Sequence, residues 1–288
     1  MTAAFVDFFP HMEQGTPEWL ALRKTKITAT DAAVILGASH WKTRFQLYNE
    51  KISEENNTFK NDAMQRGLDL EPIARDLFEI KTGLKVSPKV VINDWAMASL
   101  DGISDCGNHI VEIKCPGSKD HAIALLGKVP DHYYPQLQHQ MYVCDVESAY
   151  YFSFDGADGV VVEVLRNEEY IQKMIIEEKK FYQCLINKTP PELNEGDYIE
   201  RNDDLWQQCA LKWKSLTNSI KELEKEEEEI RKQLVFLSGE SNTKGAGISL
   251  CLVNRKGNVE YARIPELINV DLDKYRKGSI NSWRITTS

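Results

Sequence analysis

The chain has 288 residues, of which 42% are hydrophobic, and this is enough for one large core or two smaller ones. It has no apolar run of about 18 residues, so no membrane span is expected, and its net charge of −9 argues against a protein that simply coats nucleic acid. Charge can be local, so a DNA enzyme is not excluded. The six cysteines are scattered without a CxxC pair, which argues against a zinc or iron–sulfur site and is typical of reduced thiols in a cytosolic protein.

The first elements expected are two short helices joined by a link. Thr16 and Pro17 form a typical helix start, because threonine caps free N–H groups and proline fits the first helical position. Residues 27–31 supply hydroxyl groups just before a second apolar helix, Ala32–Leu36, and Arg23 is close in sequence. This pattern is typical of an anion site with a bidentate arginine contact. Ordinary helix capping, with Arg23 in solvent, is the alternative.

Residues 45–81 are predicted to be helical, with a polar break near Ser53–Thr58. Apolar residues recur at helical spacing in the second part, and Pro72 requires a helix start or a kink close to it. Glu71 has two interpretations. It forms a surface ion pair with Arg75, one helical turn away, or it is a carboxylate that points at a metal.

Three strands are expected next, at 88–93, 95–101 and 109–115, and the last two hold the most informative residues of the chain. Side chains alternate along a strand, so Glu112 and Lys114 share one face of theirs. Ser99 and Asp101, two residues apart, likewise share a face of the preceding strand. A hairpin of these strands brings two carboxylates and one ammonium group together.

Two carboxylates can hold a hard divalent cation, and a lysine beside them can orient an attacking water or offset charge on a phosphate. A surface hairpin whose charges face water is the alternative, because so short a motif occurs by chance. Glu112 and Lys114, however, lie inside an apolar run, where charge is costly unless something compensates it. This position favours the metal site.

Gln136 lies on the polar side of a predicted helix, 131–144, together with His132 and Gln140. Gln136 is in a position to reach a metal-bound water or a phosphate, and a solvated helix face is the alternative. The other elements expected in this part are a helix at 119–127, strands at 149–154 and 160–165, and a helix at 168–186 that ends before Pro190 and Pro191.

The composition shifts after Pro191, so we expect a first domain over 1–192 and a C-terminal extension over 193–288. Residues 199–237 are strongly charged and helical in pattern, long enough for an antiparallel helix pair or a short coiled coil.

A loop is expected at 238–247, followed by a hairpin of Ile248–Val253 and Val259–Ile264 that turns at Arg255–Asn258. The tail, Tyr275–Arg284, is basic and aromatic. It is suited to contact DNA or to dock on the long helices.

Several groups of residues occur together and in a fixed order along the chain. They are Trp19, Leu22-Arg23, Ile27–Thr30, Arg66-Gly67, Leu70-Glu71, Ala74-Arg75, Phe78-Glu79, Ser99–Gly102, Glu112–Pro116 and Tyr134–Gln138. The series resembles the lambda-exonuclease or YqaJ-like viral recombinase nucleases of the PD-(D/E)XK superfamily over about residues 14–188. Two departures matter little. The Thr30 hydroxyl can do the job of a serine hydroxyl, and these motifs often tolerate another residue, here Leu100, where the superfamily name has proline.

This resemblance implies an α/β fold with a PD-(D/E)XK core, a mixed central sheet flanked by helices, and a C-terminal helical and hairpin extension. It implies an alkaline exonuclease, dependent on one or two Mg²⁺ or Mn²⁺ ions, that acts 5′ to 3′ on linear double-stranded DNA. The 3′ overhangs would serve a single-strand annealing partner in phage-type recombination. A phage- or prophage-encoded homo-oligomer in the bacterial cytoplasm, with a trimeric ring as one form, is expected.

The resemblance also implies a role for each site residue. Asp101 and Glu112 would bind metal together with the Ile113 carbonyl, and Glu71 would bind or influence a second ion. Lys114 would position or activate the attacking water, and Gln136 matches the family's glutamine on the helix after the active-site strands. The residues that would hold the 5′ phosphate are Arg23, Thr30 and Ser99.

Two other functions remain open at this point. An endonuclease of restriction or repair type would use the same active site, but it would cut closed circular DNA, which an exonuclease spares. A DNA-binding or scaffold protein that kept the fold and lost catalysis is disfavoured by the complete acid–acid–lysine set.

Overall fold

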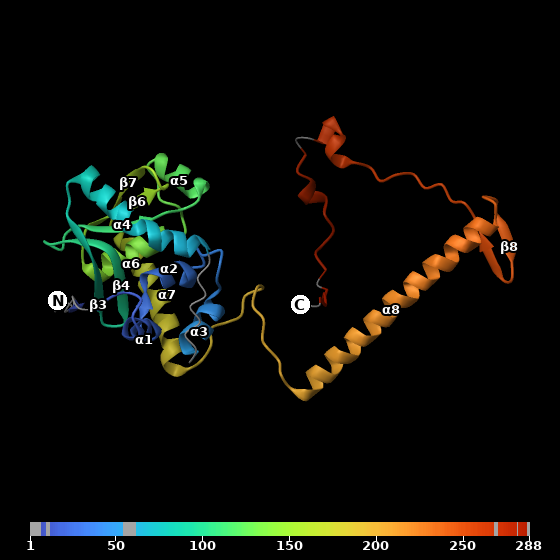
Figure 1. The fold of residues 1–288 in the computed structure, drawn as a ribbon, viewed down its shortest axis with the longest axis horizontal. Coiled ribbons are helices and arrows are strands. Elements are labelled where there is room, and N and C mark those ends of the chain that lie inside the picture. Colours follow the sequence, from blue (N-terminus) through green and yellow to red (C-terminus); the bar gives the residue numbers. More distant parts are fainter. Residues whose placement is uncertain (1–6, 10–11, 54–61, 268–269, 281, 287–288) are drawn as a thin grey trace. The chain divides into compact units, whose positions relative to one another are not determined.

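The computed structural model of the chain describes residues 7–9, 12–53, 62–267, 270–280 and 282–286 (Figure 1). The chain divides into two compact units, Met1–Tyr198 and Ile199–Ser288. Among the helices described, none is both long and apolar enough to cross a membrane. All six cysteines are free thiols.

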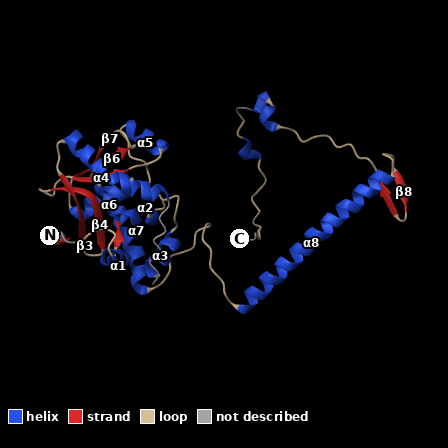
Figure 2. Ribbon diagram, viewed as in Figure 1, coloured by secondary structure: helices blue, strands red, loops and turns tan. Residues whose placement is uncertain are grey.

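A seven-stranded mixed sheet forms the centre of the first unit (Figure 2). The pairs β5–β6 and β2–β4 are parallel and the others are antiparallel. The five strands expected between residues 88 and 165 are confirmed as β3 to β7. Along the sheet the strands are β1 (Asp7–Phe9), β3 (Val86–Asn93), β4 (Ala96–Ser104), β5 (Ile110–Lys114), β6 (Ser148–Phe154) and β7 (Gly159–Leu165), and β2 (Ile27–Thr28) pairs with β4.

Helices cover both faces of this sheet. Tyr151 and Phe152 are neighbours on β6 and point to opposite faces, into two separate apolar cores. One core contains Leu137 and the other contains Phe78, so α6 and α4 lie on opposite faces. The helices are α1 (Pro17–Thr25), α2 (Ala29–Ile35), α3 (Arg44–Ile52), α4 (Asp62–Thr82), α5 (Ser118–Leu125), α6 (Tyr134–Cys144) and α7 (Glu168–Asn187).

The start of α1 is as predicted, and the start of α2 is not. Thr16 caps α1, since its hydroxyl accepts a hydrogen bond from the Trp19 N–H at 3.3 Å. Helix α2 begins at Ala29 rather than Ala32, because the Asp31 carboxylate accepts the Thr28 N–H at 2.7 Å and closes the first turn early.

Helix α4 passes through Pro72, so this proline does not mark a helix start. The predicted break at Ser53–Thr58 lies, beyond Ser53, outside the described residues.

A β-bulge interrupts β4 at Asp101. Ile103 pairs with Ser87 and Leu100 pairs with Lys89, so Pro88 alone stands opposite the two residues Asp101 and Gly102. Proline has no N–H to donate to the ladder, which makes it suited to such a position. A Cβ on Gly102 would lie 2.7 Å from the side chains of both Val111 and Val86, so only glycine fits here. The bulge therefore breaks the strict alternation of this strand, because Leu100 and Ile103, three residues apart, pack into the same core.

One edge of β4 is also divided between two partners. It pairs with β2 up to Met97 and with β5 from Gly102 onward. In the described sheet, residues 98–101 have no strand partner on that edge. Ser99 and Asp101 lie in this interval, and side chains can reach their backbone there.

The second unit contains one long helix, α8 (Asp204–Leu237), so the antiparallel helix pair, one of the two forms expected here, is wrong. The physical reason is that no glycine or proline interrupts residues 204–237. Three short 3₁₀ helices, Tyr261–Arg263, Pro265–Leu267 and Leu272–Tyr275, follow later in the chain.

The hairpin after α8 is not the predicted one. Its strands are β8 (Thr243–Gly245) and β9 (Ile248–Leu250), so it begins inside the predicted loop. Ala246 and Gly247 form a two-residue turn with φ of +46° and +80°, the positive angles that a tight hairpin requires. Val259–Ile264 is not a strand, and Tyr261–Arg263 within it is a 3₁₀ helix.

Candidate active site

Glu112 is the centre of the site. It lies on β5 and its residue surface is 1% exposed. One carboxylate oxygen, Oε1, accepts a hydrogen bond from Gln136 Nε2 at 2.5 Å and forms an ion pair with Lys114. The other oxygen, Oε2, accepts a hydrogen bond from Gln140 of the same helix α6. Two buried amides and one ammonium group thus hold this carboxylate in one orientation.

Asp101 lies against β5 beside Glu112. Its Oδ2 accepts the Ile113 N–H at 2.8 Å, and its main-chain oxygen accepts a hydrogen bond from Arg75 Nε at 2.7 Å. Burial and the neighbouring Glu112 carboxylate raise the pKa of Asp101 well above its usual range. Two carboxylates therefore share a poorly solvated site with too little positive charge.

Lys114 faces Glu112 at the more open side of the site. Its side chain is 25% exposed, and its Nζ lies 5.4 Å from the centre of the Tyr133 ring. Burial lowers the pKa of this ammonium group, but the Glu112 and Asp101 carboxylates outweigh burial, and the net shift is upward. Glu112 and Lys114 share a face, as strand alternation predicts.

Glu71 forms the ion pair with Arg75 that the helical spacing predicts. Burial raises its pKa, Arg75 opposes that shift, and Glu112 adds to it. Among the described residues, no three His, Cys, Asp or Glu side chains are gathered closely enough to hold a metal by themselves. Glu71 is thus held by Arg75 and is not gathered with Asp101 and Glu112.

The donor set nevertheless fits a hard divalent cation. Asp101 and Glu112 provide carboxylate oxygens, the type of ligand that Mg²⁺ and Mn²⁺ prefer. Burial first and the Glu112 carboxylate second raise the pKa of Asp101, and a cation bound there would offset both effects.

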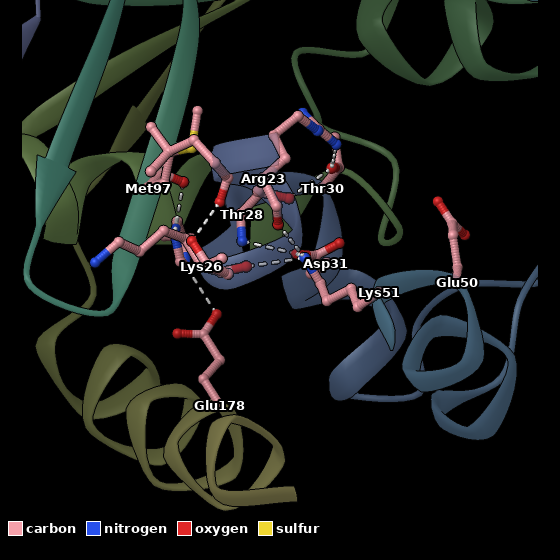
Figure 3. Close-up of polar contacts among 12 residues, drawn as sticks. Arg23, Lys26, Thr28, Thr30, Asp31, Glu50, Lys51, Met97 and Glu178 are labelled. Carbon is pink, nitrogen blue, oxygen red and sulfur yellow. Dashed lines mark hydrogen bonds and ion pairs between the residues drawn. The ribbon is translucent and has the colours of Figure 1, made fainter. Parts of the chain in front are cut away.

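The three residues predicted to hold a 5′ phosphate lie in one connected group. Arg23 Nη2 donates a hydrogen bond to the Thr30 hydroxyl at 3.2 Å, and Figure 3 shows these two polar groups together. The Arg23 guanidinium carbon lies 4.5 Å from the centre of the Trp19 ring. The Trp19 indole N–H donates to the Ser99 hydroxyl at 2.9 Å. Trp19 therefore connects α1 to the sheet.

Strand β4 links this group to the carboxylates. Ser99 and Asp101 are two residues apart on β4, and such a step spans about 7 Å along a strand. Ser99 and Asp101 thus lie two positions apart on one strand, while Arg23 and Thr30 belong to α1 and α2.

Three contact residues were missed as members of the site. Gln140 binds Glu112, Arg75 binds the main chain of Asp101, and Trp19 binds Ser99. The spacing of Gln136 and Gln140, one helical turn apart, was the available signal. Gln138, which lies in the quoted motif, instead bonds the Leu165 carbonyl and the Asn167 N–H, each at 2.9 Å.

The fold and the site together define the class of protein. A mixed sheet flanked by helices, with an acid on one central strand and a Glu-x-Lys sequence on the next, is the PD-(D/E)XK nuclease fold. Residues 18–147 match the model of the YqaJ-like viral recombinase domain.

Two known proteins are similar to this chain. The chain is 30% identical over 183 residues to the uncharacterized protein YqaJ of Bacillus subtilis (strain 168), a match that covers 59% of this chain and 56% of that protein. The chain thus spans little more than half the length of this relative. It is also similar to the crystal structure of LHK-Exo, an alkaline exonuclease from Laribacter hongkongensis, with a TM-score of 0.53, 27% identity and coverage of 60% of this chain and 94% of that chain. The crystal structure of LHK-Exo in complex with dAMP gives the same TM-score of 0.53 at 28% identity.

Proposed function

We propose that this protein is a metal-dependent exonuclease that degrades linear double-stranded DNA from 5′ to 3′. The observation that carries the proposal is the Glu112 carboxylate, which Lys114, Gln136 and Gln140 hold beside Asp101. A buried pair of carboxylates with one lysine is costly to a fold, and phosphodiester hydrolysis is a reaction that uses it. The likeness to LHK-Exo supports the same class of reaction.

The proposed metal ligands are Asp101, Glu112 and the Ile113 carbonyl, with Glu71 at a second ion when Arg75 releases it. A bound Mg²⁺ or Mn²⁺ ion would neutralise charge on the scissile phosphate and acidify the attacking water. Lys114 would orient that water through its ammonium group. Gln136 and Gln140 would keep Glu112 from turning, because each holds one of its oxygens.

The proposed anchor for the DNA end is Arg23 with Thr30 and Ser99. A guanidinium group binds phosphate through paired hydrogen bonds, and the two hydroxyls add donors beside it. An anchor that prefers a 5′ phosphate gives direction, because each cleavage leaves a new 5′-phosphorylated end. Its position along β4 from Asp101 supports binding of the terminal phosphate near the reacting one.

The biological role proposed here goes further. The 3′ overhangs would serve a single-strand annealing protein in phage-type recombination, in the cytoplasm of a bacterial host. Residues 193–288, beyond the nuclease core at 1–192, would contact that partner, other subunits or DNA. A homo-oligomer, such as a ring around the DNA, would explain processive digestion.

The test is Mg²⁺-dependent digestion of one DNA sequence as linear 5′-phosphorylated duplex and as covalently closed circle. We expect loss of the linear form from its 5′ ends and survival of the circle. Cutting of the circle would instead assign an endonuclease, and no cutting of either form would favour a binding role. Lys114→Ala is the control, and equal activity in this variant would place the reaction elsewhere.

A further inference from the structure

Lys51 is a buried ammonium group beside Asp31, which directly follows Thr30 of the proposed phosphate anchor (Figure 3). It comes from α3, and its side chain is 6% exposed. Its Nζ donates to the carbonyl oxygens of Arg23 at 2.8 Å and Lys26 at 2.9 Å, and it pairs with Asp31 Oδ2 at 2.7 Å. An ammonium group has three N–H donors, so these three acceptors use all of them.

The three acceptors belong to the segments that carry the anchor. Arg23 lies in the last turn of α1, Lys26 lies in the link, and Asp31 lies in α2 directly after Thr30. Lys51 therefore ties α1 to α2 from a third helix. This contact fixes the backbone on either side of the 3.2 Å hydrogen bond between Arg23 and Thr30.

Asp31 makes a counter-charge necessary at this position. Its carboxylate is buried, with a side-chain exposure of 7%, and Arg23 is close enough to influence it. Burial raises the pKa of Asp31, but Lys51 first and Arg23 second lower it, and the net shift is downward. Without Lys51, the ionised Asp31 would face Arg23 as its nearest cation and would compete with any bound anion.

We propose that Lys51 is a positioning residue for 5′-phosphate recognition, which neutralises Asp31 and clamps the Arg23 and Lys26 carbonyls so that the Arg23 guanidinium serves the terminal phosphate. The inference rests on the proposed function, and it extends the anchor to a buried residue that does not touch the DNA. The role of Lys51 differs from that of Thr30 and Ser99, because the hydroxyls of these two residues would contact the phosphate directly.

The experiment measures kcat and KM of the full-length protein on one linear duplex that carries either a 5′ phosphate or a 5′ hydroxyl. We expect Lys51→Met to raise KM for the phosphorylated end by about 10-fold, with a much smaller change in kcat. The preference for phosphorylated over hydroxyl ends then falls by a similar factor. Lys51→Arg keeps the positive charge next to Asp31, and we expect it to retain part of the preference.

A double-mutant cycle with Arg23→Ala distinguishes positioning from general weakening. If Lys51 acts through Arg23, then Lys51→Met has no further effect on the end preference once Arg23 is removed. Independent, additive effects of the two substitutions would overturn the proposal. An equal loss on both kinds of end in Lys51→Met would do the same.

Arg166→Met is the matched control. Arg166 is also a largely buried cation that donates to a main-chain carbonyl, that of Met141 at 2.8 Å, and its side chain is 14% exposed. It contacts α6 and the start of α7 rather than the anchor. We expect a lower Tm and an unchanged end preference, so loss of preference in this variant would show that destabilisation alone explains the Lys51 result.

A binding measurement separates failure of this inference from failure of the proposed function. Fluorescence anisotropy of the catalytically blocked Lys114→Ala protein with both duplexes reports the anchor without cleavage. Tighter binding of the phosphorylated duplex, lost on adding Lys51→Met, supports the inference even if no digestion is found. Equal binding of both duplexes would overturn the anchor and the role of Lys51 with it.

Discussion

Gln140 of α6 donates a hydrogen bond to the Oε2 atom of Glu112 on β5, and both side chains are buried. Gln136 holds the other oxygen of the same carboxylate. One turn of α6 therefore orients the central acid of the site. Contacts of this kind would hold the proposed metal ligand in place without touching the metal.

Gln140→Leu should lower kcat by about 10- to 100-fold, because Glu112 loses the donor that holds its Oε2 atom. Gln138→Leu is the control, since Gln138 is equally buried on the same helix and bonds the Leu165 carbonyl instead. Both variants should lower the Tm. Equal kcat values for the two variants would show that α6 supports the fold alone.

Divalent cations should stabilise the protein through Asp101. Saturating Mg²⁺ or Mn²⁺ binds only the folded chain, and at 100 times the Kd such binding adds about 2.7 kcal/mol to the free energy of unfolding. Thermal unfolding with EDTA and with Mg²⁺ measures the effect.

In Asp101→Asn the increase in Tm on adding Mg²⁺ should disappear. The Tm in EDTA should rise in this variant, because a buried carboxylate beside Glu112 is removed. A full Mg²⁺ effect in Asp101→Asn would exclude this residue as a ligand.

Gly102→Val should destabilise the fold by about 1–3 kcal/mol, because its side chain meets Val111 and Val86 at the bulge. Chemical denaturation gives the free energy of unfolding. Gly67→Ala in α4 is the contrast, since no neighbouring atom lies within 4 Å of a Cβ there. We expect Gly67→Ala to be neutral or stabilising by up to about 1 kcal/mol. Similar losses in both variants would contradict a tight fit at Gly102.

His139 should make stability depend on pH. Its Nδ1 pairs with Glu178 at 2.8 Å, and both side chains have 0% exposure. Burial lowers the pKa of His139, Glu178 raises it, and the net shift is upward from 6.5. A group whose pKa is higher in the folded state than in the unfolded state stabilises the fold. This contribution is complete at a pH below the unfolded-state pKa, and it is lost as the pH rises through the folded-state pKa. The free energy of unfolding should therefore fall as pH rises above about 6.5 in the native chain, and this slope should flatten in His139→Gln. An unchanged slope in the variant would assign the titration to another group.

The sequence by itself determined the elements of the core and the central acids. Helices and strands follow from the local spacing of apolar residues, so β3 to β7 and α7 lie where the pattern places them. The Glu112–Lys114 contact also follows from alternation along one strand, and the Glu71–Arg75 ion pair follows from one helical turn. All of these relationships join residues close in sequence.

Only the tertiary structure decided the relationships between distant segments. The bulge at Asp101 depends on Pro88 of another strand. Gln140 contacts Glu112 because α6 packs on the sheet. Lys51 of α3 donates a hydrogen bond to the Arg23 carbonyl of α1. Local patterns also predicted the wrong hairpin after α8. The apolar runs favoured strands later in the chain, but the tight turn forms at Ala246 and Gly247, which adopt positive φ angles. Burial and charge pairing depend on contacts throughout the packed domain, and those contacts join residues that are far apart in sequence.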